Sequence, residues 1–260
     1  MGELNGKVAI ITGGGYGIGK EIALIYARAG ARLVLTARTP GPLEETRAAA
    51  AKLGVEAIAV KVDVAKEGDC AHIAEATLKA FGRIDILVNN AGIAGPTKRT
   101  TEMALAEWQE VLDINLTGAW LASRAVIPTM VSQKSGNILM ISSGAGRRGY
   151  PFRSPYAASK WAMIGLTQTL AGEWGAEGIR VNCICPGAVE GDRIERVIQA
   201  RAEATKTPYE QVKRNFTATA AMQRMVTEEE VARVSLFLIS DLSAGVTGQT
   251  INVDAGNIMN

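Results

Sequence analysis

Tyr156 and Lys160 are the two residues whose types and spacing point most directly to chemistry. They stand four residues apart, so on a helix they would share one face. A phenol with a pKa of about 10 is a poor base at neutral pH, and a neighbouring ammonium would lower that pKa by favouring the phenolate. The pair could therefore exchange a proton with an alcohol or with a forming alkoxide. Taken alone, the same two residues could also be a core tyrosine and a solvated lysine.

A glycine-rich stretch at residues 12–19 is the second feature with chemical meaning. It reads Thr-Gly-Gly-Gly-Tyr-Gly-Ile-Gly and separates an apolar segment from a helical pattern. Glycines allow a sharp turn and a close approach to a pyrophosphate, and a helix N-terminus presents unpaired N–H groups and the positive end of its dipole. A tight turn without a ligand is the alternative. If a dinucleotide binds here, we expect contacts from Gly13, Gly15, Tyr16, Gly17, Ile18 and Gly19.

Short apolar segments alternate with helical patterns along the whole chain. The short segments are rich in Val and Ile and often apolar on both faces, which is typical of a parallel sheet covered by helices on both sides. This alternation implies right-handed crossovers and predicts an α/β fold, a Rossmann-type doubly wound parallel sheet of about seven strands. Strands are expected at residues 8–12, 33–36, 57–62, 84–88, 137–141, 179–184 and 250–253, and helices at 18–29, 42–53, 68–81, 105–133, 155–175 and 228–240.

One stretch departs from this alternation. Residues 190–225 are polar, charged and helical in tendency, and they lie between the sixth strand and the next long helix. Ligands of open α/β sheets bind beyond the carboxyl ends of the strands, so we expect this insertion to be a substrate lid. No linker, repeat or low-complexity tract divides the chain. Residues 1–260 are therefore expected to form a single Rossmann-type domain.

The composition argues against several other classes of protein. Of the 260 residues, 47% are hydrophobic and 21% are charged, with a formal net charge of +2, which gives no sign of a nucleic-acid or membrane partner. No apolar run approaches the roughly 20 residues of a transmembrane helix, and the N-terminus lacks a signal-peptide pattern, so a cytoplasmic protein is expected. Three cysteines without metal-site spacing and one isolated histidine, His72, predict reduced thiols and no metal.

Further motifs occur in order around the two features described first. Ser143 lies 13 residues before Tyr156, and Asn115 lies 28 residues before Ser143. Together these motifs resemble the single-domain short-chain dehydrogenase/reductase family over essentially the whole chain, with similarity to 3-oxoacyl-(acyl-carrier-protein) reductases and related alcohol dehydrogenases. The motifs are residues 12–19, Asp63-Val64, Asn89-Asn-Ala-Gly92, Asn115, Ser143, Tyr156-Ala-Ala-Ser-Lys160, Pro186-Gly187 and residues 246–256.

The resemblance implies an oxidoreductase that moves a hydride between NAD(P)(H) and a carbonyl compound or secondary alcohol. Tyr156 would be the general acid or base, and Lys160 would favour its phenolate and hydrogen-bond the cofactor ribose. Ser143 would hydrogen-bond the substrate oxygen, and Asn115 would hold a water beside the lysine in a proton relay. Members of this family are commonly homotetramers or dimers, which use the two long helices after strands four and five.

The resemblance also extends the expected cofactor site beyond the glycine-rich stretch. Asp63 and Val64 would meet the adenine ring, although Asp63 could equally cap the following helix. Small residues after strand four would let the cofactor approach closely. Many relatives carry a threonine where this chain has Gly191, which leaves the cofactor carboxamide without that partner. The further cofactor contacts are Asn90, Ala91, Gly92, Pro186, Gly187 and Val189.

The end of strand two bears on which nicotinamide cofactor is used. NAD sites usually place an acidic residue there to take the ribose hydroxyls, but this chain has Ala37 followed by Arg38. A guanidinium can pair with a 2′-phosphate and stack on adenine. NADP(H) is therefore favoured, and NAD(H) stays possible because Tyr16 stands where some NADP-dependent relatives carry a second basic residue.

The sequence leaves the substrate open. Substrate contacts are expected from Ser143, Ala145, Tyr150 and Tyr156, and the nearby Arg147, Arg148, Arg153 and Arg193 could meet an anion but are more simply interpreted as solvent-facing charges. A 3-oxoacyl thioester, a ketone, a sugar or polyol, and a steroid are all compatible. The alternatives are an NAD-dependent catabolic dehydrogenase of a sugar, polyol or other hydroxy compound, a reductase whose substrate a carrier protein delivers, and a non-enzymatic dinucleotide-binding sensor or scaffold. The last is disfavoured because a sensor needs no proton relay.

Overall fold

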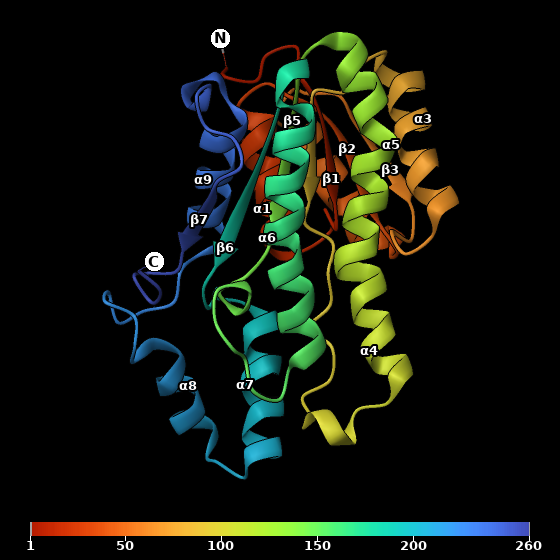
Figure 1. Ribbon diagram of the computed structural model, residues 1–260. Coiled ribbons are helices and arrows are strands. Elements are labelled where there is room, and N and C mark those ends of the chain that lie inside the picture. Colours follow the sequence, from red (N-terminus) through yellow and green to blue (C-terminus); the bar gives the residue numbers. More distant parts are fainter. Residues whose placement is uncertain (1, 260) are drawn as a thin grey trace.

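The computed structural model describes residues 2–259 and is built around one parallel sheet (Figure 1). Seven strands pair in the order β3-β2-β1-β4-β5-β6-β7. The chain crosses over between β3 and β4, which is the strand reversal of a doubly wound sheet. The strands are β1 (Val8–Thr12), β2 (Arg32–Ala37), β3 (Ala57–Lys61), β4 (Ile86–Asn89), β5 (Gly136–Ile141), β6 (Ile179–Pro186) and β7 (Thr250–Val253).

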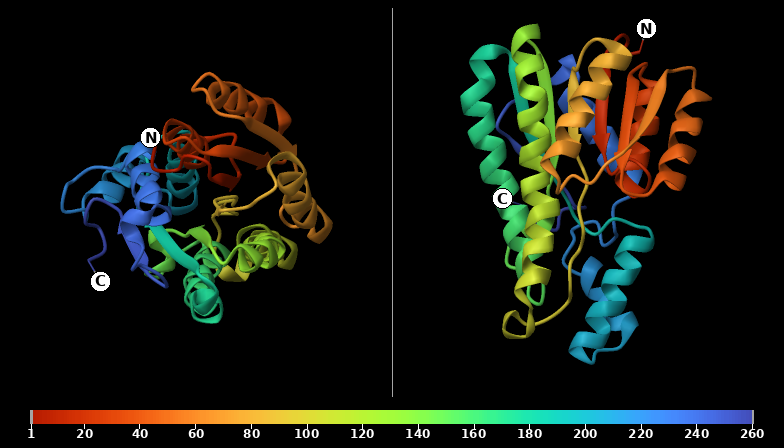
Figure 2. Two further views of the ribbon diagram at one scale, coloured as in Figure 1. Left: turned by 90° about the horizontal axis from the view of Figure 1, so that it is seen from above. Right: turned by 90° about the vertical axis from the view of Figure 1, so that its right-hand side faces the viewer.

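Helices cover both faces of this sheet, as Figures 1 and 2 show. One apolar core joins the sheet to α1, α2 and α9, and a second joins it to α3, α5 and α6. Neighbouring β1 residues Ile10 and Ile11 are fully buried in the second and the first core, because successive strand side chains point to opposite faces. These helices are α1 (Gly17–Arg28), α2 (Pro40–Ala51), α3 (Glu67–Phe81), α5 (Gly118–Gln133), α6 (Ser154–Trp174) and α9 (Glu228–Ile239). The predicted fold class is confirmed.

Two element boundaries differ from the sequence-based prediction in ways that concern function. The strand predicted at residues 57–62 ends at Lys61, so Asp63 lies in the turn that follows. The helix predicted at residues 105–133 is divided into α4 (Leu105–Leu112), a π-helical turn (Asp113–Thr117) and α5. Such turns often occur at functional sites, and this one contains the fully buried Asn115.

The segment at residues 190–225 forms α7 (Asp192–Thr205) and α8 (Tyr209–Thr217), which lie beyond the carboxyl ends of the strands (Figures 1 and 2). The two helices have a small apolar core of their own, formed by Ile198, Ala202, Val212 and Met225. A β-bridge between Val189 and Val226 joins the base of the segment to the end of the sheet. No helix within residues 2–259 is long and apolar enough to cross a membrane.

Candidate active site

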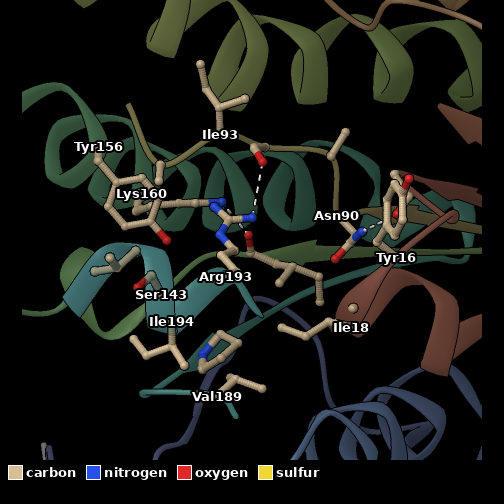
Figure 3. A pocket seen from close by; sticks show the side chains of 18 of the residues that line it. Tyr16, Ile18, Asn90, Ile93, Ser143, Tyr156, Lys160, Val189, Arg193 and Ile194 are labelled. Atoms are coloured by element: carbon tan, nitrogen blue, oxygen red, sulfur yellow. Dashed lines mark hydrogen bonds between the residues drawn. The ribbon is translucent and has the colours of Figure 1, made fainter. Parts of the chain in front are cut away.

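A cleft of about 740 Å³ opens between the carboxyl ends of the strands and α7 (Figure 3). Nearly all the site residues expected from the sequence line it, although they come from separate turns along the chain. The two exceptions are Gly19 and Asn115. Those lining the cleft are Gly13, Gly15, Tyr16, Gly17, Ile18, Arg38, Asp63, Val64, Asn90, Ala91, Gly92, Ser143, Ala145, Tyr150, Tyr156, Lys160, Pro186, Gly187 and Val189.

The glycine-rich loop forms one end of the cleft and leads directly into α1. No side chain caps the start of this helix, and its first turn carries no acidic residue, so its N–H groups and positive dipole end are available to an anion. Gly13 and Gly17 have positive φ angles of 68° and 56°, which glycine adopts without strain. Gly19 packs beneath the loop, where a Cβ would lie 2.3 Å from the Gly13 carbonyl oxygen. Gly19 therefore allows α1 to pack closely against the loop, and its contact with a cofactor stays a prediction.

The loop is held in shape by Thr12 and Asn90. The Asn90 side-chain amide donates to the carbonyls of Thr12 at 2.9 Å and Gly13 at 3.2 Å. The Thr12 hydroxyl accepts from the backbone N–H groups of Asn90 and Ala91, both at 3.0 Å. These bonds join the turns after β1 and β4, and they therefore fix the positions of the two turns relative to each other at the base of the cleft.

Arg38 and Asp63 lie in the turns after β2 and β3. Arg38 is exposed at the rim of the cleft. The Asp63 carboxylate accepts the backbone N–H of Ala65 at 3.2 Å, so it stabilises its own turn. Its backbone N–H donates to the Asp69 carboxylate at 2.7 Å. The expected helix cap is not formed, because α3 begins at Glu67 with Lys66 as its N-cap and no side chain caps it; contact of Asp63 with the adenine ring stays a prediction.

Tyr156, Lys160 and Ser143 come together at the other end of the cleft. The Lys160 ammonium lies 5.9 Å from the centre of the Tyr156 ring and donates to the Ile141 carbonyl at 2.7 Å. Ser142 Oγ donates to the Lys160 carbonyl at 2.7 Å, which attaches the start of α6 to the end of β5. Ser143, next along the chain, is turned toward the cleft (Figure 3).

The charges around Tyr156 favour its ionised form. Burial raises the pKa of the phenol, but Arg193, Lys160, the hydrogen bond from Ser143 and Arg153 together bring it below its ordinary value. Burial lowers the pKa of Lys160, against the opposing effect of the nearby Tyr156. A phenol whose pKa lies closer to neutrality is a better proton donor and acceptor at physiological pH.

Asn115 acts behind the cleft and does not line it. Its amide oxygen accepts the Ile93 N–H at 2.8 Å, and its amide nitrogen donates to the Ile93 carbonyl at 3.1 Å and to Ser159 Oγ at 3.1 Å. A Cβ on Gly92 would lie 3.0 Å from the Asn115 oxygen and 3.6 Å from Lys160 Nζ. The structure therefore shows Asn115 holding the loop after β4 beside Lys160, where the sequence suggested a water-binding side chain.

Two arginines that the sequence analysis interpreted as solvent-facing charges, Arg153 and Arg193, line the cleft. Arg193, in the first turn of α7, donates to the Gly92 carbonyl at 3.1 Å. Figure 3 shows its side chain crossing the middle of the pocket, between Tyr156 and Tyr16. Arg153 is only 4% exposed, which contradicts its interpretation as a solvent-facing charge. No sequence pattern marks either residue, because their positions depend on how the α7 segment and the turn before α6 fold onto the sheet.

The chain has neither a disulfide nor a metal cluster within the part that the structure describes. Cys70, Cys183 and Cys185 are free and buried, and no group of His, Cys, Asp and Glu side chains in residues 2–259 could hold a metal ion. Burial raises the pKa of the Cys70 thiol to about 11, so this thiol stays protonated at neutral pH.

Residues 13–257 match a family model described as "Enoyl-(Acyl carrier protein) reductase". Among curated proteins, a 3-oxoacyl-(acyl-carrier-protein) reductase of Synechocystis sp. is 39% identical over 266 aligned positions and covers 100% of both chains. The chain belongs to the short-chain dehydrogenase/reductase family. It is an oxidoreductase that interconverts a carbonyl compound and an alcohol with a nicotinamide dinucleotide.

Solved structures of this family superpose closely on the chain. NAD+-bound xylitol dehydrogenase matches with a TM-score of 0.95 at 32% identity, covering 97% of this chain and 99% of that one. Levodione reductase matches with a TM-score of 0.93 at 33% identity, covering 97% and 98%. The general function expected from the motifs is thereby confirmed.

The cleft fits a dinucleotide on its own geometry. The uncapped N-terminus of α1 suits a pyrophosphate, the turns after β2 and β3 suit the adenosine half, and the residues after β4 and β6 leave room above the sheet. Tyr156 and Lys160 then lie across the pocket from Tyr16 of the glycine-rich loop, where the nicotinamide half would reach them (Figure 3). When bound, this group donates or accepts the hydride.

Proposed function

We propose that Tyr156 is the proton-transfer residue of a carbonyl–alcohol oxidoreductase with Lys160, Ser143 and Asn115 as its supporting residues. The observation that carries the proposal is the position of the Tyr156 phenol, which shares the cleft with Ser143 and has its pKa lowered by surrounding positive charge. In reduction, the Tyr156 hydroxyl donates its proton to the oxygen of the substrate as that oxygen becomes an alkoxide. In oxidation, the phenolate accepts the alcohol proton.

The neighbouring residues prepare this transfer. The Lys160 charge stabilises the phenolate left after donation, and the Ser143 hydroxyl donates a hydrogen bond to the substrate oxygen, where negative charge develops. Asn115 is a positioning residue, because it acts through Ile93 and the loop beside Lys160. No step needs a covalent intermediate on the protein.

The Tyr156→Phe variant tests this assignment. The ring and its packing stay, but the transferable proton is lost, so turnover should fall by about 100-fold or more while dinucleotide binding changes by less than about threefold. Turnover is measured by dinucleotide absorbance and binding by fluorescence, with Tyr209→Phe on α8 as the matched control. Retained turnover in Tyr156→Phe would refute the assignment.

NADP(H) is the preferred cofactor in this proposal. The exposed Arg38 guanidinium at the rim, with Ala37 in place of an acidic residue, supports a 2′-phosphate contact. Removing one charge-assisted contact with Arg38→Ala should weaken NADPH binding by about 10-fold to 100-fold and NADH binding by less than about twofold. Both affinities are measured by fluorescence titration. Equal losses for the two cofactors would show that Arg38 does not read the 2′-phosphate.

The runner-up is an NAD-dependent dehydrogenase of a sugar, polyol or other hydroxy compound. Its support is the similarity to xylitol dehydrogenase, whose structure contains NAD+. The same titration discriminates the two, since tighter binding of NADH than of NADPH by the unmodified protein favours this second function.

We also propose that residues 1–260 form a single cytoplasmic domain with α7 and α8 as its lid, assembled into a homotetramer. The lid is supported by the position of α7 over the cleft. Assembly is supported by large apolar side chains exposed on two sides of the molecule: Trp120 on α5 and Trp161 on α6, and Phe237 on α9 with Ile251 on β7. Sedimentation of the purified protein measures the oligomeric state.

A further inference from the structure

Arg153 is a buried cation that faces the cleft next to Tyr156. The side chain lines the cleft although only 4% of the residue is exposed. One of its nitrogens, Nη1, donates to the Ala94 carbonyl at 3.1 Å. Burial lowers the pKa of this guanidinium, against the effect of Tyr150 and Tyr156, and Arg193 and Arg201 lower it further. A buried charge is costly unless an opposite charge or hydrogen bonds compensate it.

No carboxylate of residues 2–259 compensates Arg153. The ion pairs of that part of the chain involve neither Arg153 nor the neighbouring Arg193 and Arg201. Arg201 lies 5.8 Å from the rings of both Tyr150 and Phe152. Each of the three guanidiniums donates a hydrogen bond to a backbone carbonyl, those of Ala94, Gly92 and Pro151. This end of the cleft therefore has an excess of positive charge.

Two acidic residues of the cleft, Glu228 and Asp192, lie near the glycine-rich loop. A Cβ on Gly17 or Gly191 would lie 3.3 Å or 3.2 Å from Glu228 Oε1, which places this carboxylate beside the glycine-rich loop. Asp192 is close enough to Glu228 to raise its pKa. Glu228 and Asp192 are thus grouped near the glycine-rich loop and form no ion pair with Arg153 or Arg193.

We propose that Arg153, assisted by Arg193, binds an anionic group of the substrate, and that this group is a carboxylate close to the reacting carbonyl. The substrate would then be a short oxo acid, and the product the matching hydroxy acid. The inference rests on the proposed function, since it places the substrate carbonyl at Tyr156. It excludes an uncharged ketone, polyol or thioester as the preferred substrate.

The geometry explains the choice of anion. A guanidinium presents its N–H groups in a planar fork that matches the two oxygens of a carboxylate. Arg153 donates from Nη1 to the Ala94 carbonyl, which leaves Nε and Nη2 to form such a pair. The Arg193 side chain lies beside Tyr156 in the pocket (Figure 3), and Arg153 lines the same cleft three residues before Tyr156, so an anion held by these arginines lies near an oxygen bound to Tyr156. A phosphate would satisfy the same donors and is distinguished by experiment.

The experiment compares substrates that differ only in charge. Pyruvate, acetoacetate and levulinate are each measured against their methyl esters, and dihydroxyacetone phosphate against dihydroxyacetone. In the unmodified enzyme, kcat/KM for at least one acid should exceed that of its ester by about tenfold or more, the effect of one charge-assisted hydrogen bond. A preference confined to dihydroxyacetone phosphate would overturn the carboxylate in favour of a phosphate.

Variants attribute the preference to the arginines. Arg153→Met should reduce the acid-to-ester ratio to within about twofold by lowering the acid rate, and Arg153→Lys should retain part of the preference. Arg193→Met, at an exposed position, keeps the test decisive if Arg153→Met does not fold. Arg214→Met on α8, outside the cleft, is the control and should keep the ratio. The inference would be overturned if Arg153→Met and Arg193→Met each lowered kcat/KM equally for the acid and its ester. It would also be overturned if the unmodified enzyme showed no preference for the acid.

A binding measurement separates this inference from the proposed function. If none of these carbonyl compounds is reduced, binding replaces turnover as the readout, and the proposed function is still tested by Tyr156→Phe. Calorimetry of acetoacetate and methyl acetoacetate with the protein–dinucleotide complex then decides the inference. Binding of the acid that Arg153→Met abolishes supports it, whereas equal binding of acid and ester overturns it.

Discussion

Replacing Asn115 with alanine should destabilise the protein and slow turnover without changing dinucleotide affinity. The substitution removes both hydrogen bonds to the Ile93 backbone and one to Ser159. A buried polar group left without a partner costs about 1–3 kcal/mol. Ile93 is half-buried, so water can replace part of the hydrogen bonding that its backbone N–H and carbonyl lose. The free energy of unfolding should therefore fall by about 2–4 kcal/mol, which corresponds to roughly 5–10 °C in Tm for a chain of this size.

The effect on turnover follows from the loop that Asn115 holds beside Lys160. A shift of the reacting groups by about 1 Å can cost about 100-fold in rate, so kcat should fall by about 10-fold to 100-fold. The Kd of the dinucleotide should stay within about threefold, because Asn115 does not line the cleft.

Asn182→Ala is the matched control for this variant. Asn182 is buried on β6, donates to the Val246 carbonyl at 2.8 Å and accepts the Gln249 N–H at 3.1 Å. Its loss should lower Tm by a similar amount and leave kcat within about twofold. Thermal melts, steady-state kinetics and fluorescence titration give the three quantities. If Asn115→Ala keeps the Tm and kcat of the unmodified enzyme, or loses kcat no more than Asn182→Ala does, the positioning role is refuted.

Two further predictions concern charge in the cleft. Arg193→Met removes the charge that most lowers the pKa of the Tyr156 phenol, so Tyr156 should ionise at higher pH in this variant. The measurement is the tyrosinate absorbance of the cofactor-free protein, from which the absorbance of the same protein carrying Tyr156→Phe is subtracted. A shift to lower pH would contradict this prediction. Desolvation, Glu21 and Asp192 raise the pKa of Glu228 beside Gly17, so dinucleotide binding should strengthen as the pH falls and Glu228 is protonated. Above that pKa, the Glu228→Gln variant should bind the dinucleotide about threefold to tenfold more tightly than the unmodified protein, because screened repulsion near a surface is on the order of 1 kcal/mol. This difference in affinity should disappear at low pH. A difference that is independent of pH would assign the effect to packing.

The fold followed from the sequence because its signals are local. Short Val/Ile-rich segments apolar on both faces are typical of buried strands in a covered parallel sheet, and the alternation with helices leaves few topologies. The site residues followed for the same reason. Gly13, Asn90 and Pro186 lie at or directly after strand ends, so parallel strands necessarily bring them to one edge.

The boundary errors arose where long-range contacts override local pattern. The apolar periodicity of residues 105–133 continues through the π-helical turn, but the turn itself accompanies the bonds between Asn115 and Ile93, which are 22 residues apart. Gly19 has the same backbone freedom as Gly17, and only the packing of α1 against Gly13 shows that it faces away from the cleft.

The sequence by itself determined the family chemistry of this protein: a glycine-rich loop ahead of a helix, and a tyrosine and a lysine four residues apart. The tertiary structure decided the electrostatics of the substrate end. Arg153 and Arg193 are 40 positions apart in the sequence, one before α6 and the other after β6, and each looks like an ordinary surface charge. Only the folded turn before α6 buries Arg153 at 4% exposure, and only the position of α7 brings Arg193 to Gly92. Burial and mutual distance set the energy of a charge, and neither can be read from residue type.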